Sequence, residues 1–194
     1  RRSFKRGARV SAPGASSASA ARRQTVLVVG GGVGGFNLAA RLSEMPWTKD
    51  GRRSAPNIIM VDPKDRFVFT PLLVDYGVSQ EVELDEFAPT YERLLKRLEA
   101  ERKTVTAPIE HLKGTVTTID WRRRFAIVKE EGGEERRLEF DALVVSPGQL
   151  ASPPQGFEVS GRGVNVMPFA TLADAEALRA RLREGAPGSV AVVG

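Results

Sequence analysis

A glycine-rich turn between an apolar strand and a helical segment is the feature that most constrains this chain. Residues 26–29 read Val-Leu-Val-Val, a mostly β-branched run that suits a buried strand of a parallel sheet. Glycines follow in the spacing G-x-G-x-x-G, at Gly30, Gly32 and Gly35. In such a turn the first glycine permits a tight bend, the second lets the backbone approach a pyrophosphate, and the third lets the next helix pack close to the strand. The pattern predicts a dinucleotide site.

The residues after the turn supply the other parts of that site. Val33 and Gly34 begin a predicted helix, whose free backbone N–H groups and positive dipole end favour phosphate binding. A second strand is predicted over residues 57–62, and Asp62 at its end can accept hydrogen bonds from both hydroxyls of a ribose. Asp62 lies farther along the chain from the glycines than is usual for this pattern, because residues 43–56 form a predicted polar loop between the helix and the second strand. A glycine-rich packing turn without a ligand is the alternative, but this order of elements favours a nucleotide, either FAD or NAD.

Charge and residue content exclude several other functions within this stretch. Residues 1–23 hold seven basic residues and no acidic one, which leaves 22 basic against 24 acidic residues in the rest of the chain. Because that remainder has no basic surplus, nucleic-acid binding is not predicted. The absence of cysteine excludes thiolate metal sites and thiol nucleophiles here. His111, the single histidine, cannot form a metal-binding cluster and is predicted to be a bystander, so no catalytic residue and no metal ligand is assigned.

The first 23 residues have the composition of a targeting sequence. They combine arginine with Ser, Ala and Gly, and they contain no continuous apolar run of the kind that a secretory signal needs. This composition predicts an organelle transit peptide, for the chloroplast before the mitochondrion because Ser and Ala dominate. A disordered basic tail is the alternative. No apolar run anywhere in the sequence is long enough to span a bilayer.

A proline-containing segment after the second predicted strand carries a family resemblance. Residues 62–73, Asp-Pro-Lys-Asp-Arg-Phe-Val-Phe-Thr-Pro-Leu-Leu, resemble the type II NADH dehydrogenase family, among the flavoproteins that carry two dinucleotide-binding folds. In that family the stretch passes beside the flavin ring, so the resemblance implies FAD as the cofactor and places Pro71 and Leu72 nearest the flavin. Trp47 and the pair Ala88-Pro89 are similar to the plastid and cyanobacterial branch, which includes demethylphylloquinone reductases.

Two further segments extend the resemblance, which covers residues 25–194. Residues 111–120 are similar to the strand whose main chain pairs with the FAD adenine, which implies this contact for Val116. Residues 140–148 are similar to an apolar strand that ends in a turn beside the flavin, which implies a flavin contact at Gly148. The two residues before that glycine, Ser-Pro, depart from the usual ones, and proline removes a backbone donor.

The remaining patterns give the predicted domain organisation. A hairpin over residues 122–137 matches the β meander that interrupts the FAD domain of the superfamily. Helices are predicted over residues 83–102 and 171–184. Residues 189–194 repeat the pattern of the first strand and glycine, which indicates a truncated second Rossmann fold that binds NAD(P). The expected parts are a tail over residues 1–23, an α/β, Rossmann-like FAD-binding domain with a parallel sheet and an inserted β meander over residues 24–185, and the first strand of the NAD(P)H-binding domain over residues 186–194.

The resemblance implies an oxidoreductase that passes hydride from NAD(P)H to FAD and electrons on to a prenylquinone. It implies a quinone as the partner, and it allows peripheral membrane association through the C-terminal half of the protein and a homodimer. Two alternatives stay open. One is another FAD/NAD(P)H reductase without redox cysteines, of the monodehydroascorbate reductase or apoptosis-inducing-factor type, and the other is a non-catalytic flavin-binding scaffold. Because the second nucleotide site is cut off, the 194-residue chain alone is expected to be inactive.

Overall fold

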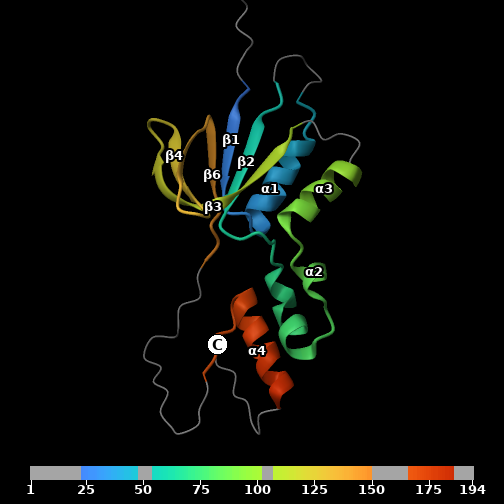
Figure 1. Cartoon of the computed structure of the whole chain (residues 1–194). Coiled ribbons are helices and arrows are strands. Elements are labelled where there is room, and N and C mark those ends of the chain that lie inside the picture. The colour runs from blue at the N-terminus through green and yellow to red at the C-terminus, as the bar shows by residue number, and fades with distance from the viewer. Residues whose placement is uncertain (1–22, 48–53, 102–106, 150–165, 186–194) are drawn as a thin grey trace, which may run out of the picture.

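A computed structural model of the chain describes residues 23–47, 54–101, 107–149 and 166–185 (Figure 1). The strands are β1 (Thr25–Val29), β2 (Asn57–Asp62), β3 (Ile109–Asp120), β4 (Phe125–Glu130), β5 (Glu135–Glu139) and β6 (Ala142–Val145). The helices are α1 (Val33–Glu44), α2 (Leu84–Phe87), α3 (Tyr91–Glu101) and α4 (Leu172–Glu184). Two short turns of helix complete the elements, the 3-10 turn η1 (Thr70–Leu72) and the π-helical turn η2 (Asp75–Ser79).

The strands form one six-stranded sheet in the order β5-β4-β3-β2-β1-β6 (Figure 1). The four strands β3, β2, β1 and β6 run parallel, and β4 and β5 add to β3 as an antiparallel meander. β3 serves both parts, because it pairs with β2 as far as Lys113 and with β4 from Gly114 onward. The predicted Rossmann-like α/β fold with an inserted meander is therefore confirmed.

β1 is covered on both of its faces, as its continuous apolar sequence predicted. Val28 packs with Ala39 of α1 and Tyr91 of α3 on one face of the sheet. Leu27, its neighbour, belongs to the cluster on the other face, together with Val128 of the meander. Full burial of one such apolar side chain stabilises the fold by about 1.5–3 kcal/mol. The two layers together hold β1, and with it the turn that follows.

The helix predicted over residues 83–102 is interrupted in the structure, which has α2 and α3 in its place. Pro89 lacks a backbone N–H and disfavours the helical conformation of the residue before it. Ala88 accordingly has φ −129° and ψ 58°. The Pro89 carbonyl accepts a hydrogen bond from the Phe67 N–H at 3.0 Å. The break therefore ties the start of α3 to the loop after β2.

α4 packs against the segment between β2 and α3 to form a helical layer on the side of the carboxyl ends of the parallel strands (Figure 1). Thr171 caps α4, because its hydroxyl accepts from the Asp174 N–H at 3.2 Å while the Asp174 carboxylate accepts from the Thr171 N–H at 2.8 Å. Gly77 of η2 allows close packing, since a Cβ there would lie only 3.3 Å from the Cβ of Ala175. The helix predicted over residues 171–184 is confirmed.

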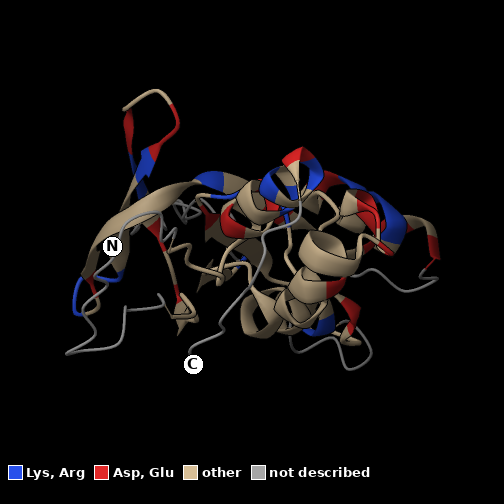
Figure 2. Ribbon diagram, turned by 90° about the horizontal axis from the view of Figure 1, so that it is seen from below, with Lys and Arg blue, Asp and Glu red and all other residues tan. Residues whose placement is uncertain are grey.

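Charged residues of both signs are intermixed over the described helices and hairpin (Figure 2). On α3, Lys96 pairs with Glu92 at 2.6 Å and Arg97 with Glu101 at 2.7 Å. Exposed pairs of this spacing contribute only about 0.3–0.5 kcal/mol each, so the apolar clusters dominate the stability of the fold.

Two predictions concern residues outside the described ranges. They are the transit peptide, apart from Arg23, and the strand of the second Rossmann fold over residues 189–194. They stay predictions.

Candidate dinucleotide-binding site

The glycine turn joins the carboxyl ends of three neighbouring strands. The Gly30 N–H donates to the Val61 carbonyl of β2 at 2.8 Å, and the Ser146 N–H after β6 donates to the Val29 carbonyl of β1 at 2.7 Å. Gly30 has a φ of 95°, and a Cβ at this position would overlap the Ser146 carbonyl oxygen. Conformation and space therefore both require glycine where the three strands meet.

The start of α1 has a buried side and an open side. Gly31 and Gly35 are buried, whereas Gly32, Val33 and Gly34 are exposed. A Cβ on Gly35 would overlap the backbone of the turn, so the helix packs directly against it, while a Cβ on Gly32 would meet nothing within 4 Å. Gly32 is the N-cap of α1. Helix N–H groups on a first turn that is open at Gly32 form an arrangement that can receive a phosphate.

Asp62 ties the turn to the end of β2. Its side chain is buried, with Oδ2 accepting from the Gly31 N–H at 2.7 Å and Oδ1 accepting from the Lys64 N–H at 2.9 Å. Hydrogen bonds to an ionised acceptor are among the stronger ones in proteins. The sequence predicts this carboxylate as a ribose acceptor, and the structure adds that it also fixes the Gly31 peptide. Each oxygen keeps a further lone pair that a ribose hydroxyl can use.

Tyr91 and His111 lie beneath the turn. The Tyr91 side chain is 1% exposed, and its hydroxyl is the nearest atom to the space that a Cβ on Gly31 would occupy. Its ring lies 4.4 Å from that of His111, centroid to centroid. Burial, followed by the charges of Asp62 and Asp65, raises the pKa of Tyr91. In the sequence Tyr91 lies on the apolar stripe of the helix predicted over residues 83–102, which indicates packing, and its hydroxyl is the only signal there for another role.

Acidification is expected to weaken the fold through His111. Burial lowers the pKa of His111, and the Asp62 carboxylate offsets this effect in part. The unfolded chain has a histidine pKa of about 6.5, so below that pH the unfolded state binds the proton more readily than the folded state. Stability is therefore complete above about pH 6.5 and is lost as the pH falls toward the lowered folded pKa. Urea unfolding between about pH 5.5 and 8 measures the slope of the free energy of unfolding against pH.

The variant His111→Phe, which keeps a ring against Tyr91, is expected to flatten that slope. Because His111 is the only histidine of the chain, no other imidazole can supply it. A slope that is unchanged in the variant would contradict this assignment.

An apolar pocket of about 340 Å³ lies beside the start of α1. Its walls include Phe36 of α1 and Phe67, Phe69 and Leu72 from the loop after β2. The rings of Phe36 and Phe67, both in this wall, lie 5.6 Å apart, centroid to centroid. Pro71, next to Leu72 on η1, is exposed. The two residues predicted nearest the flavin thus lie at the edge of an apolar wall, and their contact with a flavin stays a prediction.

The remaining two predicted contacts lie at the same end of the sheet. Val116 is in β3, three residues beyond the last pair with β2, and it pairs with Val128 of β4. Among the described strands, none pairs with β3 beyond Lys113 on the side of β2. That edge has backbone groups that a flat base can approach, as the predicted adenine contact requires. Gly148, in the turn after β6, is exposed and has a φ of 76°.

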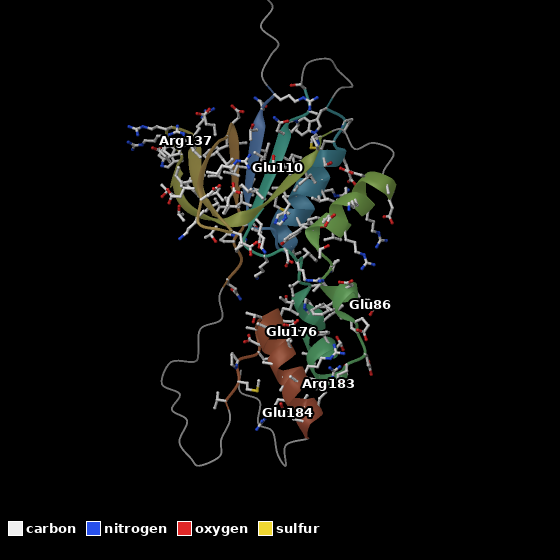
Figure 3. The ribbon with its side chains drawn as sticks, in the orientation of Figure 1. Glu86, Glu110, Arg137, Glu176, Arg183 and Glu184 are labelled. Atoms are coloured by element: carbon white, nitrogen blue, oxygen red, sulfur yellow. The ribbon has the colours of Figure 1, made fainter. Side chains whose placement is uncertain are left out.

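Side chains that could bind a metal do not gather in the described part of the chain, where no group of three His, Cys, Asp or Glu is suitably placed. None of the helices described here has the length and apolar content that crossing a bilayer requires. The charged side chains labelled in Figure 3 lie along the sheet (Glu110, Arg137) and on the helical layer (Glu86, Glu176, Arg183, Glu184). The polar groups at the turn include backbone N–H groups, the Asp62 carboxylate, the Tyr91 hydroxyl and the Ser146 hydroxyl.

A parallel sheet, a glycine turn, an open helix start and an acid after the second strand are the parts of a Rossmann-type fold of the kind that binds dinucleotides. Residues 24–194 match the family described as pyridine nucleotide-disulphide oxidoreductase. The chain therefore belongs to the pyridine nucleotide-disulphide oxidoreductase family, in agreement with the resemblance that the sequence predicted.

Two relatives are similar over most of this chain. The chain is 32% identical over 163 residues to the demethylphylloquinone reductase NdbB of Synechocystis, and this match covers 83% of this chain and 36% of that protein. It is 30% identical over 188 residues to the alternative NAD(P)H-ubiquinone oxidoreductase C1, chloroplastic/mitochondrial, of Arabidopsis thaliana. This match covers 89% of this chain and 34% of that protein. The chain thus spans about a third of the length of these relatives.

Solved structures show the same fold. NDH2 from Plasmodium falciparum, in complex with NADH, is similar with a TM-score of 0.60 at 18% identity, over 81% of this chain and 28% of that one. An NAD-dependent persulfide reductase from A. fulgidus has a TM-score of 0.61 at 27% identity, over 84% of this chain and 28% of that one.

Proposed function

We propose that the protein carrying this chain is an FAD-dependent NAD(P)H:quinone oxidoreductase of the type II NADH dehydrogenase kind. The observation that carries the proposal is the open start of α1 at Gly32 beside the fixed Asp62 carboxylate, in a chain of this family. The names of the two relatives, a demethylphylloquinone reductase and an NAD(P)H-ubiquinone oxidoreductase, support a quinone as the electron acceptor.

The residues of the turn fit FAD in both space and chemistry. The backbone N–H groups of residues 32–35 are placed to bind the pyrophosphate, and Asp62 to accept from the ribose of the AMP half. The free edge of β3 at Val116 is assigned to the adenine, and residues 71–72 with Gly148 to the flavin ring. FAD supplies the hydride-accepting chemistry when bound. The chain orients it and, through the apolar wall beside α1, limits the access of water.

The whole protein is expected to contain more than these residues provide. We place the NAD(P)H and quinone sites in the part of the relatives that the chain does not match, so the 194-residue chain alone is expected to be inactive. The composition of residues 1–23 supports the plastid over the mitochondrion, and the relatives are compatible with either compartment. Peripheral membrane association and a homodimer are further parts of the proposal.

A visible absorption spectrum of the purified full-length protein, recorded before and after anaerobic addition of NADH, tests the proposal. We expect the spectrum of an oxidised flavin, and we expect it to bleach as hydride is accepted. Reoxidation by a soluble quinone then tests the acceptor. A flavin that responds to neither NADH nor NADPH would favour the non-catalytic scaffold, for which the unusual pair Ser146-Pro147 is the supporting observation. A protein without any flavin would contradict the assignment of the turn to FAD.

A further inference from the structure

Two polar groups lie side by side beneath the glycine turn. The Nε2 of His111 is buried and has no hydrogen-bond partner among the described residues. The Tyr91 hydroxyl is the nearest atom to the space that a Cβ on Gly31 would occupy, and the Tyr91 ring lies 4.4 Å from that of His111. Buried polar groups are nearly always paired, so the unpaired nitrogen beside this hydroxyl requires an explanation. A ligand that is bound at the turn would provide one.

Tyr91 is held firmly in this position. It is the first residue of α3, and its N–H donates to the Asp65 carbonyl in the loop after β2 at 2.9 Å. Its ring packs between His111 and Phe36, with centroid distances of 4.4 Å and 6.3 Å. The hydroxyl therefore reaches Gly31 from below on a side chain that has little freedom to move.

The hydroxyl lies at the ribose end of the site, not at its phosphate end. Its nearest neighbour in the turn is Gly31, whose N–H is bonded to Asp62, the residue assigned to the ribose. The space next to Gly32 is assigned to the pyrophosphate, and no atom of Tyr91 lies within 4 Å of the place that a Cβ on Gly32 would take. Asp62 can only accept hydrogen bonds, whereas each ribose hydroxyl both donates and accepts. A tyrosine hydroxyl supplies the missing donor.

We propose that the Tyr91 hydroxyl donates a hydrogen bond to a ribose hydroxyl in the AMP half of the bound FAD, with the His111 ring positioning the tyrosine. This inference rests on the proposed FAD site and adds α3 to the elements that recognise the cofactor. Asp62 and Tyr91 then bind the ribose together, one as acceptor and one as donor.

The test compares Tyr91→Phe with Tyr76→Phe. The chain has only two tyrosines, and Tyr76 is a buried one in the helical layer, which makes it a matched control. We expect Tyr91→Phe to raise the Kd for FAD about fivefold to tenfold, because it removes one hydrogen bond and keeps the ring. The Tm of the flavin-free protein is expected to stay unchanged, since the packing of the ring is kept. Tyr76→Phe is expected to leave the Kd unchanged.

Competition of ADP, 2′-deoxy-ADP and 3′-deoxy-ADP against FAD identifies the contacted group. In the wild-type protein, loss of the contacted hydroxyl should weaken binding. In Tyr91→Phe the same loss should cost less than in the wild type, because only the bond to Asp62 is then lost. A wild-type protein that binds FAD while Tyr91→Phe binds it equally well would overturn this inference alone. The inference would also be overturned if Tyr91→Phe bound FAD more weakly than the wild type but lost as much affinity as the wild type when ADP is replaced by 2′-deoxy-ADP or by 3′-deoxy-ADP. A wild-type protein that binds no FAD would overturn the proposed function together with the inference.

Discussion

Replacing Gly30 with alanine is expected to lower the free energy of unfolding by about 3 kcal/mol. Two costs add at this position, since a φ of 95° is strained for a residue with a Cβ and that Cβ would overlap the Ser146 carbonyl oxygen. The Ser146 backbone cannot move aside easily, because its N–H is bonded to the Val29 carbonyl. Relief of the overlap would therefore separate β6 from β1. Urea unfolding of the purified variant measures the loss.

Gly32→Ala is the matched control, because it changes the same turn without a clash. Gly32 has a φ of −63°, and no atom lies within 4 Å of the added methyl. Alanine is a poorer N-cap than glycine, so the expected loss of stability is less than about 1 kcal/mol. The methyl would, however, stand where the pyrophosphate is proposed to approach, and the affinity for FAD is expected to fall at least about tenfold. Equal unfolding free energies for the two variants would contradict the steric argument, and unchanged FAD binding by Gly32→Ala would contradict the phosphate assignment.

The elements that the sequence predicts well are those that local pattern determines. β1 and β2 are short apolar runs that end at a glycine and an aspartate, and both lie where the pattern places them. The hairpin of β4 and β5 follows from two alternating segments around Gly132 and Gly133, which have φ values of 109° and 92°. The hydrophobic periodicity of a strand and the residue composition of a turn can both be recognised from neighbouring residues alone.

The arrangements that the sequence does not predict depend on residues far apart in the chain. Asp62 reaches back across 31 positions to the Gly31 N–H, and no spacing rule gives this bond. Tyr91 lies under the same glycine, although its position on an apolar stripe indicates packing alone. Pro89 is visible in the sequence as a helix breaker, but the bond of its carbonyl to Phe67 depends on the loop after β2. Such contacts follow from the tertiary fold.

These contacts share one consequence, which is that the turn is held from three sides before any ligand binds. β2 fixes Gly30 through the Val61 carbonyl, Asp62 fixes the Gly31 peptide, and Tyr91 supports Gly31 from below. A site that is already in its binding shape loses less conformational entropy when the ligand arrives. The carboxylate is the only one of the three that is charged, so its removal should have the largest effect on both shape and affinity.

Asp62→Ala is expected to lower the free energy of unfolding by about 2–3 kcal/mol and to abolish retention of FAD during purification. The Gly31 N–H is buried and would lose its acceptor, whereas the exposed Lys64 N–H can bond to water. Asp62→Asn keeps one oxygen acceptor, so it should lose about half as much stability and bind FAD weakly. Asp65→Ala, at an exposed acid three residues later, is the control and should stay within about 0.5 kcal/mol of the wild type. If Asp62→Ala were as stable as Asp65→Ala, the bond to Gly31 would not hold the turn. If it also kept its flavin, the carboxylate would not be the ribose acceptor.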